Sequence, residues 1–298
     1  SSGYEVDFFI KNKEILEKLM ITEGEKYFKY NVTRFQKNTK LRIIFGGLLD
    51  LLIQNFSLLK KCLRKRPIAM LGTDIAVAHI GWLTKIRSFV FNEDDFEVNK
   101  SFCKFAYPFA SHIVSPNVCD AGKFSFKKIG YEGYQKLSYL HPNRFNPSRE
   151  RIKEFIGEGK YFMIRLVSLS AGHDIEQDHK GLNYDDLRRL TELLKPLGQV
   201  FISSEKKLPE EFSRFELKTP VNVIHDLMFY SSMFISDSQS MTVECCMLGV
   251  PNIRINTFVG KISVLEELEN KYQLTVGFHP NDKDLFFGKV HEFINDTQ

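Results

Sequence analysis

The sequence predicts an α/β protein made of two halves, each with a parallel sheet flanked by helices. Short apolar runs recur along the chain, among them Ile68 to Leu71 and Met233 to Ile235, and this composition is typical of buried parallel strands. Segments with helical periodicity separate the runs, and such alternation indicates a doubly wound sheet. The alternation stops between residues 133 and 148 and then restarts. We therefore expect one domain over residues 1–145 and a second over residues 146–298.

The first half contains strands and helices in regular alternation. We expect strands at residues 4–10, 26–31, 68–71, 87–92, 112–115 and 127–129, and helices at residues 11–21, 41–65, 75–83 and 98–108. The helix over residues 41–65 is long and apolar and ends in the basic residues Lys60, Lys61, Arg64 and Lys65. Basic side chains suit the negative end of a helix dipole. The same composition also fits a helix that lies on an anionic membrane, so peripheral membrane contact through residues 41–65 is a second expectation.

The second half repeats the pattern after a segment that reads as a linker. We expect strands at residues 161–169, 199–203, 215–217, 233–235, 252–255 and 275–277, and helices at residues 149–156, 184–197, 222–231, 264–272 and 283–295. A further helix follows the strand at 233–235 and ends at Gly249 and Pro251. Two such sheets are expected to direct the carboxyl ends of their strands toward a shared central cleft, where open α/β sheets bind ligands.

Composition narrows the function. With 43% hydrophobic and 26% charged residues the chain reads as a globular protein, and its net charge of +4 does not indicate a nucleic-acid partner. The five cysteines have no metal-binding spacing, so we expect a reducing, cytoplasmic setting and no metal. The sequence contains no run of eighteen apolar residues, so we expect no membrane span. Motifs for a dinucleotide fingerprint, a P-loop, a zinc protease or a serine hydrolase are missing from the sequence, and no cofactor is expected.

The polar turn from Ser236 to Ser240 is the strongest candidate for a binding site. It follows a buried strand and opens a helix, where the first backbone amides have no intrahelical partner and the helix dipole is positive. A turn of small residues at this place can bind a phosphate, and Glu244, nearly two turns into the helix, could accept hydrogen bonds from a ribose diol. An ordinary Ser or Asp helix cap explains the same residues equally well.

The segment SDSQSMTVECCMLGVP resembles a motif of the UDP-N-acetylglucosamine 2-epimerases, SDSGGxQEEA followed by LGxP, within the GT-B superfamily. The resemblance implies that the turn (Ser236, Ser238, Gln239, Ser240) binds the phosphates of UDP and that Glu244 holds the ribose. The family has Gly-Gly where this chain has Gln239 and Ser240, whose side chains would crowd a diphosphate.

A broader resemblance covers nearly the whole chain. The stretches RLVSLSAGHD, VNVIHDLMFYSSMFISDSQSMTVECCMLGVP and NTFVGKISVLEELENKY are similar to an uncharacterised prokaryotic family, domain-of-unknown-function family 354. That family is grouped with GT-B proteins and linked to surface polysaccharide synthesis. Its members begin with one more strand and helix, so we expect that the first βα unit is missing here.

Further candidates follow from the same comparison. His173, Asp74 and Glu93 follow strands at which the epimerases carry catalytic groups, so we assign them catalytic roles. Each has a competing explanation: His173 could be an ordinary loop residue, Asp74 a helix cap and Glu93 part of a solvated charge cluster. Arg165 lies inside an apolar strand and would neutralise a diphosphate or a structural carboxylate. By resemblance, His225 would lie near the uracil.

Three functions remain open from the sequence. The first is a GT-B glycosyltransferase that moves a sugar from a UDP-sugar to a lipid-linked or saccharide acceptor. The second is a UDP-N-acetylglucosamine 2-epimerase, and the third is a sugar-nucleotide-binding protein without catalysis. Fold analogy supports all three and distinguishes none of them.

Overall fold

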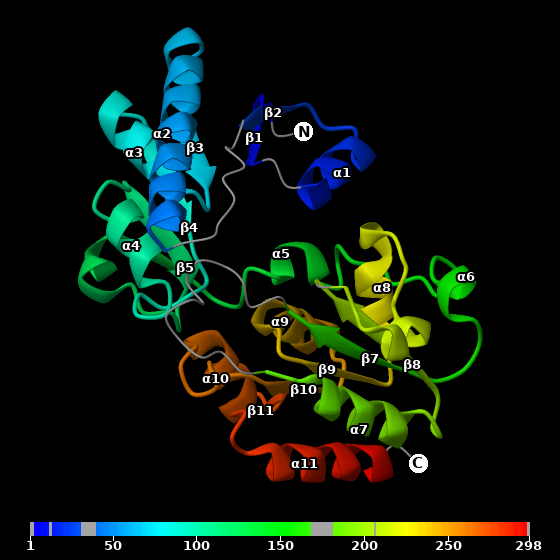
Figure 1. Ribbon diagram of the computed structural model, residues 1–298. Helices are drawn as coiled ribbons and strands as arrows, with labels where there is room; N and C mark the ends of the chain where they lie inside the picture. Colours follow the sequence, from blue (N-terminus) through cyan, green and yellow to red (C-terminus); the bar gives the residue numbers. More distant parts are fainter. Residues whose placement is uncertain (1–2, 12–13, 31–39, 168–180, 206, 297–298) are drawn as a thin grey trace. The chain divides into compact units, whose positions relative to one another are not determined.

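The chain folds into two compact units, shown in the computed structural model of Figure 1. The structure describes residues 3–11, 14–30, 40–167, 181–205 and 207–296. Unit 1 comprises residues 1–115 and 120–131, and unit 2 comprises residues 116–119 and 132–298. The division thus falls at residue 131, whereas the sequence suggested a boundary near residue 145.

Most strands of unit 1 lie in one sheet with the order β3-β4-β5-β6. The strands and their helices are β3 (Ala69–Gly72), α3 (Ile75–Thr84), β4 (Arg87–Phe91), α4 (Lys100–Ala106), β5 (His112–Pro116), the 3-10 helix Gly122–Lys127 and β6 (Lys128–Tyr131). β3, β4 and β5 run parallel, with Ala69 opposite Arg87 and Phe89 opposite His112. Small and aromatic side chains such as Ala78, Val90 and Tyr107 form the core beneath α3 and α4.

The first two strands of unit 1 form a sheet of their own. β1 (Phe8–Lys11) pairs in parallel only with β2 (Tyr27–Tyr30) among the described residues, and α1 (Glu14–Thr22) connects them. The long helix α2 (Lys40–Arg64) then leads to β3. The strands appear where the sequence predicts them, but the pattern of apolar residues does not determine which strand pairs with which.

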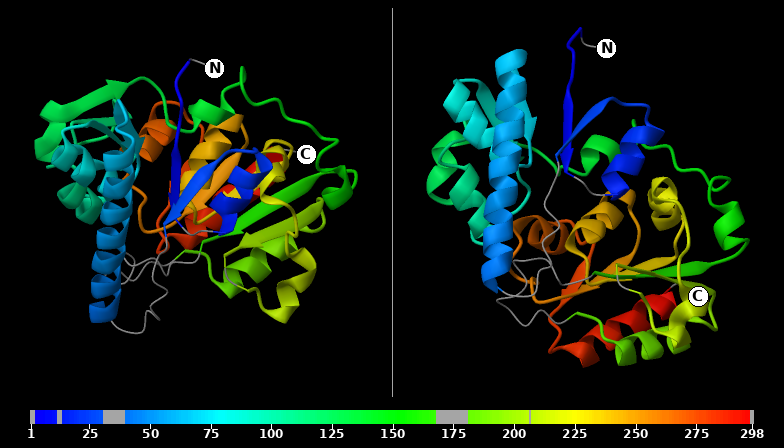
Figure 2. Two further views of the ribbon diagram at one scale, coloured as in Figure 1. Left: turned by 90° about the horizontal axis from the view of Figure 1, so that it is seen from above. Right: turned by 45° about the horizontal axis from the view of Figure 1, so that its top comes forward.

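Unit 2 contains a five-stranded parallel sheet with the order β11-β10-β9-β7-β8. The strands are β7 (Tyr161–Leu166), β8 (Gln199–Ser204), β9 (Met233–Ser236), β10 (Asn252–Ile255) and β11 (Val276–Phe278). The helices are α5 (Leu137–Leu140), α6 (Lys153–Ile156), α7 (Tyr184–Leu194), α8 (Ile224–Phe229), α9 (Gln239–Leu248), α10 (Ser263–Asn270) and α11 (Lys283–Asp296). Figures 1 and 2 show α7 and α11 on one face of this sheet and α8 and α9 on the other.

Apolar side chains cover both faces of the sheet in unit 2, as a buried parallel sheet requires. Alternate residues of β7 divide between two cores: Ile164 packs toward α7 and α11, whereas Met163 packs toward α8 and α9. The strand expected at residues 215–217 does not form. A 3-10 helix (Glu210–Phe215) includes the first residue of the expected strand, and Glu216 makes only an isolated bridge to Ile202.

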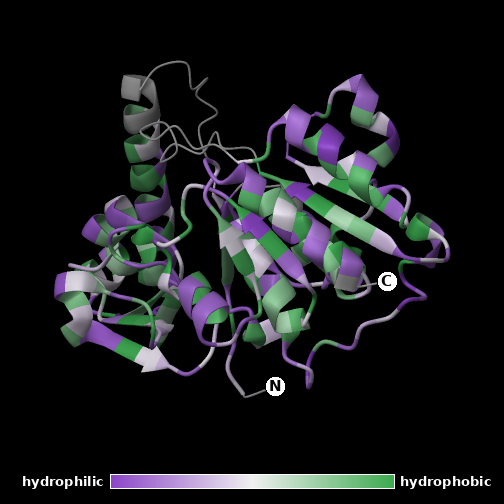
Figure 3. Ribbon diagram, turned by 90° about the horizontal axis from the view of Figure 1, so that it is seen from below, coloured by the Kyte–Doolittle hydropathy of each residue, from purple (hydrophilic) through white to green (hydrophobic). Residues whose placement is uncertain are grey.

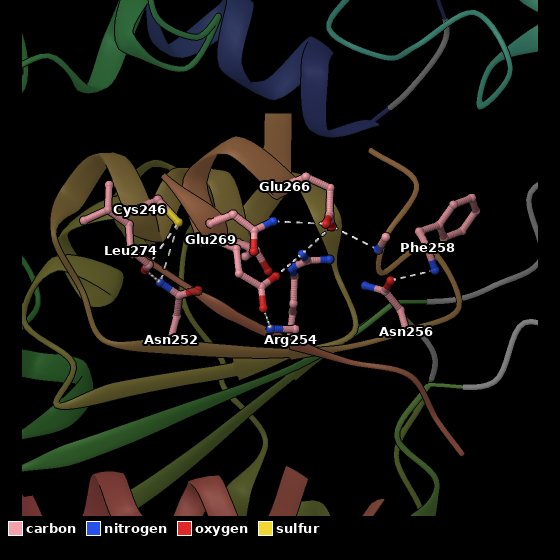
Figure 4. A network of polar contacts seen from close by, with 12 residues as sticks. Cys246, Asn252, Arg254, Asn256, Phe258, Glu266, Glu269 and Leu274 are labelled. Carbon is pink, nitrogen blue, oxygen red and sulfur yellow. Dashed lines mark hydrogen bonds and ion pairs between the residues drawn. The ribbon is translucent and has the colours of Figure 1, made fainter. Parts of the chain in front are cut away.

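A fully buried arginine organises the end of the sheet around β10 (Figure 4). The Nη2 atom of Arg254 donates to Glu266 (3.1 Å) and to Glu269 (2.5 Å), both on α10. The two carboxylates in turn accept hydrogen bonds from the backbone amides of Gly260 (2.9 Å) and Gly277 (2.8 Å). A buried charge is tolerated only when it is paired in this way. The network therefore holds α10, β11 and the loop after β10 together.

Gly277 leaves the space that the Arg254 guanidinium occupies. A Cβ atom at residue 277 would lie 2.7 Å from Cζ of Arg254, and the guanidinium is enclosed on all sides. We expect Gly277→Ala to lower the free energy of unfolding by about 1–3 kcal/mol, the usual cost of overpacking, as measured by urea denaturation. Gly288→Ala is the matched control, because no atom lies within 4 Å of its Cβ position in α11. The control should be neutral or slightly stabilising, and an equal loss in both variants would contradict the packing argument.

Candidate nucleotide-binding site

The turn between β9 and α9 is closed by its own serines and leaves the next two amides open. Ser236 Oγ accepts a hydrogen bond from the Ser238 amide (2.7 Å), and Ser238 Oγ caps α9 by accepting one from the Met241 amide (3.4 Å). In the part of the chain that the structure describes, the backbone amides of Gln239 and Ser240 have no hydrogen-bond acceptor. Ser238 is therefore a helix cap, and the amides after it are still available to an anion.

The order of the strands places this turn at the topological switch point of unit 2. β7 and β9 are neighbours, but the chain leaves β7 for β8 on one side and leaves β9 for β10 on the other. Doubly wound sheets bind their ligands outside the carboxyl ends of the two strands at such a point. The switch point thus favours a ligand at the turn independently of the local sequence.

Asp237 fastens the turn to the neighbouring strands. Its carboxylate accepts the Val167 amide at the end of β7 (2.8 Å), and its backbone carbonyl accepts the Asn256 side-chain amide after β10 (3.2 Å). A Cβ atom at residue 181 would lie 2.7 Å from Asp237 Cβ, so Gly181 allows the backbone to approach closely. Burial raises the pKa of Asp237 to about 7, although the Val167 amide and the Arg165 charge act in the opposite direction. The sequence did not single out Asp237, because its partners come from other strands.

Arg165 lies next to the turn but is already engaged. It is in register with Ser236 of β9 and with Ser203 of β8. Its guanidinium donates to Ser203 Oγ (2.8 Å) and to Glu205 (2.8 Å), while its buried Nε has no partner among the described residues. Arg165 thus pairs with a carboxylate, and its expected role toward a diphosphate stays a prediction.

Glu244 is held between a tyrosine and a histidine. Its Oε1 accepts a hydrogen bond from the hydroxyl of Tyr139 (2.8 Å), and its Oε2 lies 3.6 Å from Nε2 of His225 on α8. The rings of Tyr139 and His225 are 5.5 Å apart, and Phe145 contacts the edge of the same histidine. The structure thus brings together His225, Glu244 and Tyr139, and the roles expected for His225 and Glu244 toward a nucleotide stay predictions.

Tyr139 was missed because residues 133–148 read as a linker. Part of this segment is the short helix α5, which belongs to unit 2. The Tyr134 hydroxyl also binds a glutamate of unit 2, Glu267 (2.7 Å). Aromatic residues are uncommon in a solvated linker, and their presence here was the available signal.

The expected catalytic residues fall in unit 1 or outside the described residues. Asp74 caps α3 by accepting the Ala76 amide (3.0 Å) and forms an ion pair with Lys11 (2.7 Å). Glu93 follows β4, the neighbour of β3, so Asp74 and Glu93 lie at the same edge of that sheet. His173 lies outside the described residues. The catalytic roles of these residues stay predictions.

A metal site was not expected. Among the described residues no cluster of three or more His, Cys, Asp or Glu side chains could hold a metal ion. The described part of the chain also contains no helix that is both long and apolar enough to cross a membrane.

The architecture is similar to that of several solved structures. One is a putative UDP-N-acetylglucosamine 2-epimerase from Listeria monocytogenes, with a TM-score of 0.65 and 11% identity over 98% of this chain and 80% of that one. Another is the UDP-GlcNAc 2-epimerase of Methanocaldococcus jannaschii in complex with UDP-GlcNAc and UDP, with a TM-score of 0.60 and 11% identity over 97% and 92% of the two chains. A third is UGT89C1 of Arabidopsis thaliana complexed with UDP, with a TM-score of 0.57 and 12% identity over 93% and 79%.

Sequence comparison adds nothing to this structural likeness. No protein-family model matches the chain, and no curated protein sequence matches it. The resemblance to domain-of-unknown-function family 354 therefore stays a prediction. At 11–12% identity the likeness shows the fold alone. The chain has a GT-B fold, with two Rossmann-like units built on parallel sheets.

Proposed function

We propose that this protein binds a UDP-sugar at the start of α9 and acts as a GT-B glycosyltransferase in surface polysaccharide synthesis. The observation that carries the proposal is the pair of open amides at Gln239 and Ser240 at the switch point of unit 2, with a carboxylate, Glu244, further along the same helix. The neighbours that were solved with UDP or UDP-GlcNAc have the same fold. The acceptor is a saccharide or a lipid-linked saccharide.

The diphosphate would bind where the helix offers donors and positive potential. The amides of Gln239 and Ser240 would donate to the phosphate oxygens, and the dipole of α9 would stabilise their charge. The two side chains stand where the epimerase motif has glycines, so they must point away from the diphosphate. Arg165 would contribute positive charge only in part, because Glu205 already neutralises it.

The nucleoside would bind along α9 toward α8. Glu244 would accept hydrogen bonds from the ribose hydroxyls, while Tyr139 holds its carboxylate in place. A carboxylate oxygen can accept more than one hydrogen bond, so Tyr139 and a ribose hydroxyl can share Oε1. The exposed edge of the His225 and Tyr139 pair would then contact the uracil.

A 2-epimerase is the second candidate. Two of the structural neighbours named above are epimerases or putative epimerases, and Asp74, Glu93 and His173 would be its catalytic groups. One observation favours the transferase: Asp74 is engaged as a helix cap and in an ion pair with Lys11. A binding protein without catalysis is the third candidate.

Nucleotide binding is tested by thermal shift with UDP and with 2′-deoxy-UDP. At a hundred times the dissociation constant, UDP should stabilise the wild type by about 2.7 kcal/mol. The deoxy nucleotide should bind roughly tenfold more weakly, because one hydrogen bond to the Glu244 carboxylate is lost. Glu244→Gln should weaken UDP and remove the preference for ribose, whereas Glu267→Gln, a glutamate of the same unit that also accepts a tyrosine hydroxyl, should change neither. The absence of any shift with UDP would contradict the proposed function.

The contribution of Tyr139 can be isolated with a matched pair of variants. Tyr139→Phe removes the hydroxyl that orients Glu244 and should weaken UDP binding by about twofold to tenfold, the worth of one hydrogen bond. Tyr134→Phe removes a similar bond to Glu267 in the same unit and should leave UDP affinity unchanged. Titration calorimetry measures both. Equal affinities in the two variants would show that Tyr139 does not position Glu244.

The two enzymatic candidates differ in their treatment of the C2 proton. A transferase breaks the bond between the sugar and UDP and leaves C2 untouched, so UDP-GlcNAc incubated with the protein in heavy water should keep its C2 proton. Mass spectrometry of the recovered nucleotide measures the exchange. Deuterium at C2 would exclude the transferase and establish the epimerase.

A further inference from the structure

One edge of unit 1 combines exposed apolar side chains with several basic ones. Parallel strands all begin at the same edge of a sheet, so the segments that lead into β3 and β4 meet there. We call this surface the basic edge. Its members are Leu63, Arg64, Lys65, Arg66, Ile68, Trp82, Leu83, Lys85 and Arg87.

The two segments of the basic edge form one continuous surface. The guanidinium of Arg66 donates to the backbone carbonyl of Thr84 (2.9 Å), which joins the end of α2 to the end of α3. Ala69 pairs with Arg87 where β3 and β4 begin. The side chains of residues 63–68 therefore lie beside those of residues 82–87.

The charge of the basic edge has one sign. Residues 63–68 and 82–87 contain five Lys or Arg residues and no Asp or Glu. Lys65 forms an ion pair with Glu5 (2.5 Å), but Arg64, Lys85 and Arg87 have no carboxylate partner in the described part of the chain. All three are exposed. The surface thus attracts a partner with dense negative charge.

Large apolar side chains stand among these charges. The exposed fractions of Leu63, Ile68, Trp82 and Leu83 are 75%, 81%, 63% and 56%. Exposing an apolar patch of this kind to water is unfavourable unless a partner covers it. Leucine, isoleucine and tryptophan beside arginine and lysine match the boundary between lipid headgroups and acyl chains, where tryptophan is enriched. A nucleic acid would use the positive charge but would leave the aliphatic side chains in water.

The outward face of α2 continues the apolar surface. Phe45, Leu48, Leu52 and Phe56 recur at helical spacing along α2, and their exposed fractions are 69%, 53%, 55% and 71%. Figure 3 shows hydrophobic segments along this helix. Leu58 and Cys62 of the same helix are buried in a core shared with α3. The exposed side is therefore unlike the polar face of an ordinary surface helix.

We propose that the basic edge docks on an anionic phospholipid bilayer. The four apolar side chains of the edge enter the interface, and Arg64, Lys85 and Arg87 bind the headgroup phosphates. Each basic residue near such a surface adds a modest attraction that salt screens, so the contact is reversible and weakens as the salt concentration rises. This inference stands without the proposed function, because none of its residues belongs to the candidate nucleotide site.

Trp82 provides the test, because it is the one tryptophan of the chain. Vesicles of equimolar phosphatidylglycerol and phosphatidylcholine should shift its fluorescence to shorter wavelength, and brominated lipid should quench it. The protein should sediment with these vesicles at low salt and be released as salt is raised. Vesicles of phosphatidylcholine alone should produce a much smaller effect. Unchanged fluorescence and no sedimentation with anionic vesicles would overturn the proposal.

Matched charge reversals locate the contact. Lys85→Glu/Arg87→Glu should reduce affinity for anionic vesicles at least tenfold, whereas Lys195→Glu/Lys218→Glu makes the same change of net charge on exposed residues of unit 2 and should reduce it far less. Circular dichroism of both variants confirms folding. An equal loss in the two variants would overturn the assignment to this edge. So would tighter binding of duplex DNA than of vesicles, or a dimer that the edge substitutions dissociate.

Discussion

The candidate site depends on Asp237, whose contacts fasten the ends of three neighbouring strands. The carboxylate accepts the amide that follows β7, and the backbone carbonyl accepts the side chain of Asn256 after β10. The turn is thereby fixed on both sides before the serines close it. Because the turn cannot rearrange freely, the amides of Gln239 and Ser240 keep one direction, and preorganised donors bind an anion more tightly than mobile ones do.

A second constraint on the turn comes from the buried charge of Arg254. Arg254 is enclosed beside the same strands, and one of its glutamates, Glu266, holds the loop after β10 by accepting the Gly260 amide. Asn256 accepts the Phe258 amide in that loop and also reaches Asp237. The arginine network and the turn thus share the end of β10. A substitution that breaks the ion pairs of Arg254 would therefore also disturb the position of the turn, although Arg254 is not among the residues proposed to contact the ligand.

The sequence predicts more of the fold than of the site. The buried strands of unit 2 could be predicted because both faces of each strand are apolar. The serine turn could be predicted because a helix cap and an anion site need the same small residues. Strand pairing is not encoded in periodicity, so the separate sheet of β1 and β2 was not foreseen. The partner of Glu244 was missed for a related reason. Tyr139 is distant in sequence and reaches the carboxylate only through the packing of α5 on α9.

The central claim is that the start of α9 holds the diphosphate of a UDP-sugar. A crystal structure of the protein grown with UDP tests it most directly. The account predicts phosphate oxygens within hydrogen-bond distance of the Gln239 and Ser240 amides and the ribose hydroxyls against Glu244. UDP bound elsewhere in unit 2, or a turn in which these two amides face protein acceptors and no nucleotide, would contradict it.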